Sequence, residues 1–424
     1  MIKKQNNFIT NTGIFIVVFV MLVALGKCFI YQRLSLLLFV CFLVAFLIAI
    51  KESICITIYD IFVWLSLIMI LINKSELYLW TTCLYVILAV LSYYAFRTKQ
   101  ELSMVLKFSV FFSLINIVVN IISWLNKDLY YNIAEHIFPA DMFEYAVGSR
   151  ENGLLTGLAE HYSRNAYFCV VGATVFAAAF FEARKEKKLK WVILLFAEIL
   201  MIMIIGKRGH LLFFLAALGF VYLLLEPGII KKASRFIKVL LIICLFLGAV
   251  FKFVPAASAF IDRTILQIKS GDISTGRFGL WKDAWHYFLE RPVFGWGYGF
   301  FTTHVFSIAD DSYFAGVHND YLQWLCEGGI IGFLINITIT IGFYSLSMQA
   351  FRHIHKNKQY KSCDRLFITW SVLFQTFVIL YSLTGLPHFD FEVNILYWIS
   401  CSVPMIYVQE VKPLFAKKMF IYWR

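Results

Sequence analysis

Long apolar runs, separated by short polar connections, extend over almost the whole chain. Most of them approach the roughly 20 residues that an α-helix needs to cross about 30 Å of hydrocarbon. The pattern therefore predicts an all-α, polytopic integral membrane protein with about twelve transmembrane helices in one domain, residues 1–424. The expected helices are Gly13–Ile30, Leu34–Ile50, Ile54–Ile72, Tyr78–Phe96, Met104–Leu125, Asn165–Phe181, Trp191–Ile205, His210–Leu225, Phe236–Val254, Tyr321–Phe351, Leu366–Leu383 and Phe391–Val408. No small-residue cleavage site follows the first run, so we expect it to be retained and not removed as a signal peptide.

The composition agrees with this pattern. Hydrophobic residues make up 61% of the chain and charged residues only 15%, which excludes an ordinary soluble globular protein. The nine cysteines contain no CxxC pair and fall mostly inside the predicted helices. They are therefore interpreted as small apolar residues and not as metal ligands.

The basic residues predict the orientation in the membrane. Most of the 38 Lys and Arg residues fall in short connections on one side, including Ala183–Lys190 and Arg352–Arg365. Short loops rich in Lys and Arg stay in the cytoplasm, so both termini are predicted to be cytoplasmic. The net charge of +12 follows from this bias and from anionic lipid, and needs no nucleic-acid partner. Two long connections then face outward: a first extracytoplasmic loop at 126–164 and a larger one at 255–320, between the ninth and tenth helices.

The larger outward loop contains a short amphipathic helix, expected at 276–290. Leu280, Ala284 and Phe288, together with two tryptophans, recur on one face at helical spacing. Ser274 or Thr275 is the expected N-cap, and a proline at position 292 ends the helix. Arg277 would then lie in the first turn, where free backbone N–H groups favour an anion. The alternative interpretation is an ordinary contact with lipid headgroups.

A tight outward turn, GKRG at 206–209, provides two more cations. Lys207 and Arg208 lie between two strongly apolar helices, on the side where positive charge is disfavoured. They are interpreted either as side chains that reach the lipid headgroups or as a fixed site for a phosphate, which the guanidinium can bind with two hydrogen bonds. Arg150, in the first loop, is a further candidate for the same anion.

Several other outward residues are candidates for proton transfer or substrate binding. His318 opens the tenth helix and could accept a proton near neutral pH. Glu160 and His161 lie at the start of the sixth helix and are the second choice for a base. Candidate sugar or lipid contacts come from Asn319 and from exposed aromatic residues, namely Trp281, Trp285, Trp296 and Tyr298. The aromatic residues would equally suit anchoring at the membrane interface.

The glycines of FGWGYG, at 295, 297 and 299, resemble a nucleotide loop only superficially. No strand precedes them, so that interpretation is rejected. They are expected to allow tight bends of the backbone at the membrane surface.

Together these motifs resemble the O-antigen ligase and O-antigen or capsular polysaccharide polymerase superfamily of membrane glycosyltransferases. The likeness rests on four segments: GLLTGLAEHYSRNA (153–166), GKRGHLLF (206–213), GRFGLWKDAWHYFLERPVFGWGYGFF (276–301) and HNDYLQWLCEGGIIGF (318–333). The resemblance implies a helical fold of the GT-C type and a metal-independent, cofactor-free glycosyltransferase. It maps the family's essential arginines onto Arg208 and Arg277 and its essential histidine onto His318. Lys207 departs from the family's more usual Ser-Arg turn.

The function that we expect is a polymerase of lipid-linked oligosaccharide repeat units, which builds an O-antigen, capsule or exopolysaccharide. Donor and acceptor would be undecaprenyl-pyrophosphate-linked glycans, used on the outer face of a bacterial cytoplasmic membrane. Membrane lipid, a chain-length regulator and a flippase of the same pathway are the expected partners. The first alternative is a ligase that transfers finished glycan to lipid A core or another acceptor. The second is a flippase, which would place paired repeats and broken helices at mid-membrane, a pattern not found here.

Overall fold

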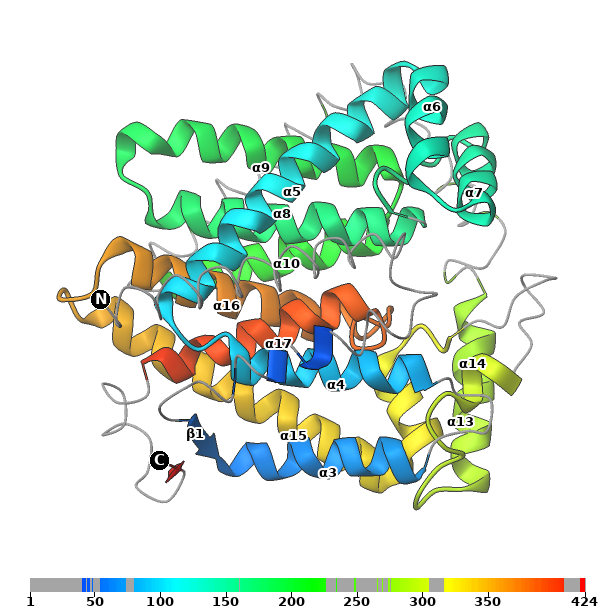
Figure 1. Ribbon diagram of the computed structural model, residues 1–424, viewed down its shortest axis with the longest axis vertical. Helices are drawn as coiled ribbons and strands as arrows, with labels where there is room; N and C mark the ends of the chain where they lie inside the picture. Colours follow the sequence, from blue (N-terminus) through cyan, green and yellow to red (C-terminus); the bar gives the residue numbers. More distant parts are fainter. Residues whose placement is uncertain are drawn as a thin grey trace.

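Helices make up almost all of the described structure, a computed structural model of the chain (Figure 1). It describes residues 54–73, 80–159, 161–225, 276–304, 316–407 and 420–423, with scattered positions elsewhere. The predicted helices Gly13–Ile30, Leu34–Ile50 and Phe236–Val254 lie outside these ranges. Five helices are long and apolar enough to cross a membrane: α5 (Lys99–Leu125), α8 (Tyr162–Glu182), α10 (Arg208–Leu225), α15 (Asp320–Lys356) and α16 (Ser362–Tyr381). These findings support an all-α membrane protein.

Four further helices complete the bundle in the described part of the chain: α3 (Ile58–Ile72), α4 (Trp80–Ala95), α9 (Lys185–Ile205) and α17 (Phe391–Ile406). Helix α16 lies at the centre and packs against α8, α10, α15 and α17. Its side chains are buried along nearly its whole length, which explains why it is apolar all round. Helices α3 and α4 pack on the far side against α15 and α17.

Two helix starts differ from the expected ones because of local capping. Helix α3 was expected from Ile54 but begins at Ile58, because the backbone N–H and hydroxyl of Thr57 donate to the Asp60 carboxylate. A short antiparallel pairing of β1 (Ile54–Thr57) with β2 (Phe420–Trp423) precedes it. Helix α5 was expected from Met104 but begins at Lys99, because Thr98 and Glu101 form a reciprocal capping box.

The connection expected as a loop over 126–164 is itself partly helical. It contains α6 (Lys127–Ile137) and α7 (Ala140–Glu151). Asn126 caps α6 by accepting a hydrogen bond from the N–H of Leu129, and Tyr130 and Ala134 bury one face of the helix. Polar residues on its other face had suggested a loop.

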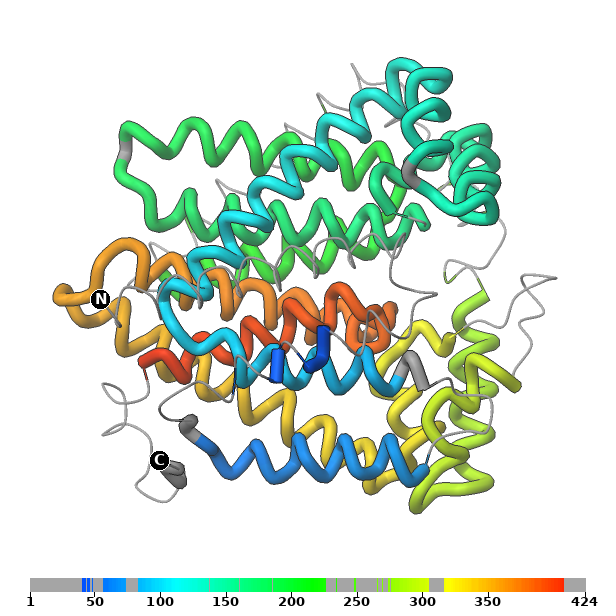
Figure 2. The backbone as a smooth tube through the Cα atoms, in the orientation of Figure 1, coloured from blue at the N-terminus to red at the C-terminus, as the bar shows by residue number. Residues whose placement is uncertain are grey.

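The two ends of the bundle differ in the helices and connections that lie there (Figures 1 and 2). Helices α6 and α7 lie at one end with α13 (Arg277–Glu290) and α14 (Phe300–His304). The basic α8–α9 and α15–α16 connections lie at the opposite end. The outward-facing elements predicted from the sequence are therefore gathered at one end.

Candidate active site

The turn between α9 and α10 places two cations at the end of the bundle that carries α13. Gly206 ends α9 in the left-handed conformation, with φ of 83°, and α10 begins only two residues later. The Lys207 Nζ lies 3.9 Å from the centre of the Tyr162 ring, a cation–π contact. Burial, and then the positive charges of Arg277 and Arg208, lower the pKa of Lys207 to about 7. Three cations from two elements therefore act on one another.

Helix α13 supplies Arg277 as its first residue. The expected cap is only partly right: Gly276 occupies the N-cap position, with φ of 83°, while the Ser274 hydroxyl accepts a hydrogen bond from the N–H of Phe278. The helix ends at Glu290, just before the predicted stop at Pro292. Leu280 and Ala284 are buried in a small aromatic cluster against α15. Arg277 is thereby held at an N-terminus that already favours anions.

The FGWGYG segment packs against α15 next to Gly329, where that helix is interrupted. Gly295, Gly297 and Gly299 all have positive φ, as the expected bends require. The N–H groups of Trp296 and Gly297 donate to the carbonyls of Cys326 and Glu327, at 3.0 and 2.9 Å. These contacts connect α13 and α14 rigidly to the first part of α15, which follows His318.

His318 lies just before α15 in a conformation that is rare for its residue type. Its φ is 53°, the only positive value among non-glycine residues in the described part of the chain. The next two residues fix this corner: Asn319 Nδ2 donates to the carbonyl of Leu383, and the N–H of Asp320 donates to the carbonyl of Ser382. Burial, and then the positive charges of Arg277 and Lys207, lower the pKa of His318 to about 4. At neutral pH the imidazole is uncharged and can accept a proton.

A second group of residues borders these cations from α8 and α17. Arg164 lies 3.8 Å from the carboxylate of Asp390 and 3.9 Å from that of Glu392. The charge of Asp390 in turn raises the pKa of Lys207, against the stronger effects that lower it. His161 caps α8, where its Nδ1 accepts from the N–H of Ser163 at 3.0 Å.

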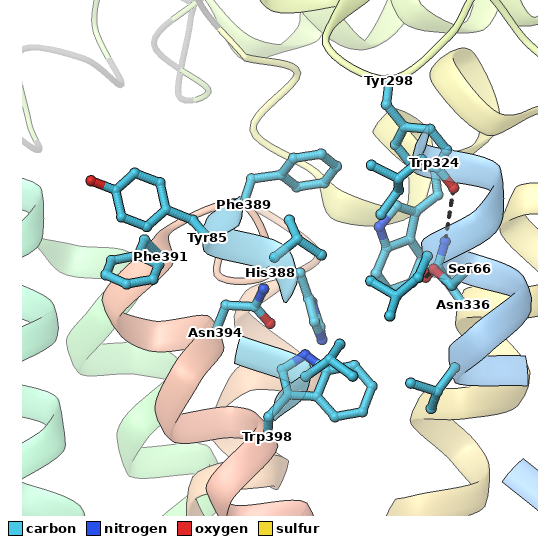
Figure 3. A pocket seen from close by; sticks show the side chains of 15 residues that line it. Ser66, Tyr85, Tyr298, Trp324, Asn336, His388, Phe389, Phe391, Asn394 and Trp398 are labelled. Atoms are coloured by element: carbon cyan, nitrogen blue, oxygen red, sulfur yellow. Dashed lines mark hydrogen bonds between the residues drawn. The ribbon is translucent and has the colours of Figure 1, made fainter. Parts of the chain in front are cut away.

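A histidine–carboxylate pair and a cavity lie next to this group. His388 Nδ1 donates to Asp320 Oδ2 at 2.7 Å, and the Ser382 hydroxyl donates to the same oxygen at 2.6 Å. His388 also lines a cavity of about 210 Å³ between α3, α4, α15 and α17 (Figure 3). Sequence reasoning missed this pair, because Asp320 and His388 are 68 residues apart and share no motif.

The arrangement of cations around a neutral histidine suits the binding of an anionic leaving group beside a base. Among the described residues, no group of three or more His, Cys, Asp or Glu side chains could hold a metal ion. Residues 191–337 match the O-antigen ligase family. This confirms the resemblance to the O-antigen ligase and polymerase superfamily. No curated protein matches the chain.

The O-antigen ligase match spans α9, α10, α13 and the first half of α15. It therefore contains Lys207, Arg208, Arg277 and His318, the four residues whose charges and positions converge. The match supports a function of the O-antigen ligase or polymerase type, acting on lipid-linked glycans. Together with the apolar helices, it supports an integral membrane protein.

Candidates in the first outward connection lie before the O-antigen ligase match. The guanidinium of Arg150 donates to the carbonyls of Ser123 and Trp124, at 2.6 and 3.1 Å, at the end of α5. It connects α7 to α5, so nothing in its contacts supports binding of pyrophosphate. The His161 ring stacks on the ring of Tyr162, which also makes the cation–π contact with Lys207. Glu160 lies outside the described residues.

The proposed sugar contacts are distributed differently from the cations. Asn319 has its amide occupied at both ends, because Oδ1 accepts from the N–H of Leu322 and Nδ2 donates to Leu383. Trp285 is 48% exposed on the outer face of α13, whereas Trp281 packs into its buried cluster. Tyr298 is buried beside the cavity, and burial raises the pKa of its hydroxyl to about 12. Of these four, Tyr298 lines the cavity of about 210 Å³ between α3, α4, α15 and α17.

Proposed function

We propose that the protein is a polysaccharide polymerase that joins undecaprenyl-pyrophosphate-linked repeat units on the extracytoplasmic face of the membrane. The observation that carries the proposal is that the charges of Arg277 and Arg208 act on Lys207, while those of Arg277 and Lys207 act on the neutral His318. The positive-inside rule assigns the basic connections to the cytoplasm. The four residues lie at the opposite end of the bundle (Figure 1).

The cations suit the leaving group. In the transfer, a hydroxyl oxygen of the acceptor sugar attacks the anomeric carbon of the donor glycan. The bond from that carbon to the pyrophosphate oxygen breaks, and undecaprenyl pyrophosphate leaves with the bonding electrons. The developing charge on the leaving oxygen needs fixed positive charge, which arginine and lysine supply without a metal ion.

His318 is the proposed base, which takes the proton from the attacking hydroxyl. Its low pKa keeps the imidazole neutral and therefore ready to accept a proton before the substrate binds. A bound pyrophosphate would offset the charges of Arg277 and Lys207, so that the pKa of His318 rises and the imidazole becomes a stronger base. Substrate binding and proton transfer are thus coupled through the same cations.

A ligase that moves finished glycan to another acceptor would use the same four residues. We favour the polymerase because the segments GLAEHYSRNA and GKRGH look more like those of polymerases from polysaccharide gene clusters. A flippase would not need a base beside three cations at one end of the bundle.

Deletion of the gene distinguishes these functions. For a polymerase, the host should accumulate lipid carrying single repeat units and lose its long surface glycan. Accumulation of long polymer without its final anchor would identify a ligase instead. Complementation of the deletion with Arg277→Ala and with His318→Ala tests the site, and normal glycan from both variants would refute the assignment.

A further inference from the structure

The cavity between α3, α4, α15 and α17 contains polar groups that the proposed transfer reaction does not use. Its walls are mostly apolar, part aromatic and part aliphatic, and the aromatic part includes Tyr85, Trp324, Phe389 and Trp398 (Figure 3). Within these walls, the His388 ring projects into the space beside the side chain of Asn394 and above Trp398 in the view.

One nitrogen of His388 is fixed and the other is left without a partner. Nδ1 donates to the fully buried Asp320, so the neutral imidazole carries its lone pair on Nε2. Nε2 is buried and has no hydrogen-bond partner among the described residues. The rings of Trp324 and Tyr397 meet the imidazole edge-on, with centroids 5.1 and 4.7 Å away, and hold its orientation.

Asn394 gives a second polar group without a partner. Its side-chain amide forms no hydrogen bond with any residue that the structure describes, whereas Asn336 binds the Tyr298 hydroxyl and the carbonyl of Gly332. A buried nitrogen without a partner, such as His388 Nε2, is costly, so a ligand that satisfies it gains affinity. An isoprenoid chain could not satisfy either group, but the hydroxyls of a sugar could.

We propose that this cavity binds the acceptor sugar, with one hydroxyl donating to His388 Nε2, another bound by the Asn394 amide, and the ring against the aromatic walls. The proposal rests on the proposed glycosyltransferase function. The segment His388–Asp390 adjoins both sites, because His388 lines the cavity while the charge of Asp390 acts on Lys207. A sugar in the cavity would therefore lie next to the cations that bind the donor.

The test uses the purified full-length protein, the host's own lipid-linked repeat unit as substrate and undecaprenyl pyrophosphate as inhibitor. His388→Asn keeps a donor for Asp320 but lacks the distal nitrogen, and Asn394→Leu keeps the side-chain volume but lacks the amide. Each variant should raise KM for the repeat unit about fivefold to tenfold, the effect of one lost hydrogen bond. The inhibition constant of undecaprenyl pyrophosphate should not change. His286→Asn, on the exposed face of α13, is the matched control and should behave as wild type.

Three results would overturn the proposal. A wild-type KM in both variants would show that the sugar does not bind in the cavity. A rise in KM with a parallel rise in the inhibition constant of undecaprenyl pyrophosphate would show that the cavity holds the isoprenoid chain. If the wild-type protein released no undecaprenyl pyrophosphate from the repeat unit, the proposed function itself would fail, and the acceptor site with it.

Discussion

At the scale of single residues, Arg277 begins a surface helix and Arg208 a long apolar one, yet the charges of both act on Lys207. We predict that Arg277→Ala lowers the rate of glycan transfer roughly a hundredfold or more, as expected when one group that stabilises a developing anion is lost. Arg277→Lys should recover only part of the rate, because an ammonium group cannot bind two phosphate oxygens in parallel.

The control for Arg277 is Arg352→Ala, an exposed arginine at the opposite end of the bundle, and transfer should stay at the wild-type rate. Initial rates with the purified lipid-linked repeat unit give the measurement. Equal rates for Arg277→Ala and Arg352→Ala would remove Arg277 from the site.

Lys207 makes binding of the donor depend on pH. Its pKa of about 7 means that it is increasingly uncharged above neutrality, so a glycan-linked pyrophosphate should bind more weakly as pH rises, by at most about tenfold per unit. Both phosphates of this ligand are esterified and keep their charge over that range. Lys207→Arg should abolish the dependence between about pH 6 and pH 9. A wild-type dissociation constant that is flat over this range would contradict the lowered pKa.

The same pKa gives the sign of the effect of Lys207 on stability. The unfolded chain keeps the proton up to the ordinary pKa of 10.5, whereas the folded protein releases it near 7. Between these values the unfolded state binds more protons, so stability rises with pH in that window. Placing Lys207 in a buried position near Arg277 and Arg208 therefore lowers the stability of the folded protein at pH values where the lysine is charged.

Candidate site residues could be chosen from the sequence where a motif carried them, and not where folding created the contact. His318, Arg208 and Arg277 fall in recognisable segments. Arg150 looked equally free to bind an anion, but its guanidinium is occupied by carbonyls at the end of α5, a contact that no local pattern reveals. The partnership of His388 with Asp320 likewise exists only after α15 and α17 have packed together.

At the scale of elements, α15 is broken at Gly329, where φ is 62° and ψ is −167°, a combination open essentially only to glycine. A Cβ there would lie 2.3 Å from the carbonyl oxygen of Val293. We predict that Gly329→Ala destabilises the protein by several kcal/mol, from about 1–3 kcal/mol of backbone strain plus this clash. Thermal unfolding in detergent gives the measurement.

Gly279→Ala is the matched control for this break. Gly279 lies in α13 with nothing within 4 Å of an added Cβ, so alanine should be neutral or stabilising by about 0.5–1 kcal/mol. If both alanine variants unfolded at the same temperature, the break in α15 would not depend on glycine.

Helices with a clear apolar period were predictable from the sequence, whereas features that depend on contacts with other segments of the chain were not. Helices α8, α10 and α16 begin within a few residues of their expected starts. The helix over Tyr321–Phe351 was predicted without a break, because the break depends on FGWGYG, which packs against it from another part of the chain. Helix α6 was missed because its polar face conceals a short apolar stripe, and α7 because it has almost no apolar period.

At the scale of the whole molecule, the two ends of the bundle should face different compartments, since the basic connections gather at one end and α13 at the other. Two exposed positions report on this. Cys363 lies in the first turn of α16 at the basic end, and Asp283 lies on α13. In a background without other cysteines, a membrane-impermeant maleimide should label Asp283→Cys in intact spheroplasts. Cys363 should react only after the membrane is permeabilised, as the positive-inside rule requires.

The result bears directly on the chemistry. Labelling of Cys363 in intact spheroplasts would place Lys207, Arg208, Arg277 and His318 in the cytoplasm, where soluble activated sugars are available and a lipid-linked donor has no advantage. Labelling of Asp283→Cys alone would place the same four residues where no soluble activated sugar exists. A donor anchored in the membrane by its lipid is then required, and cations at the end of the bundle would suit the pyrophosphate at the membrane surface.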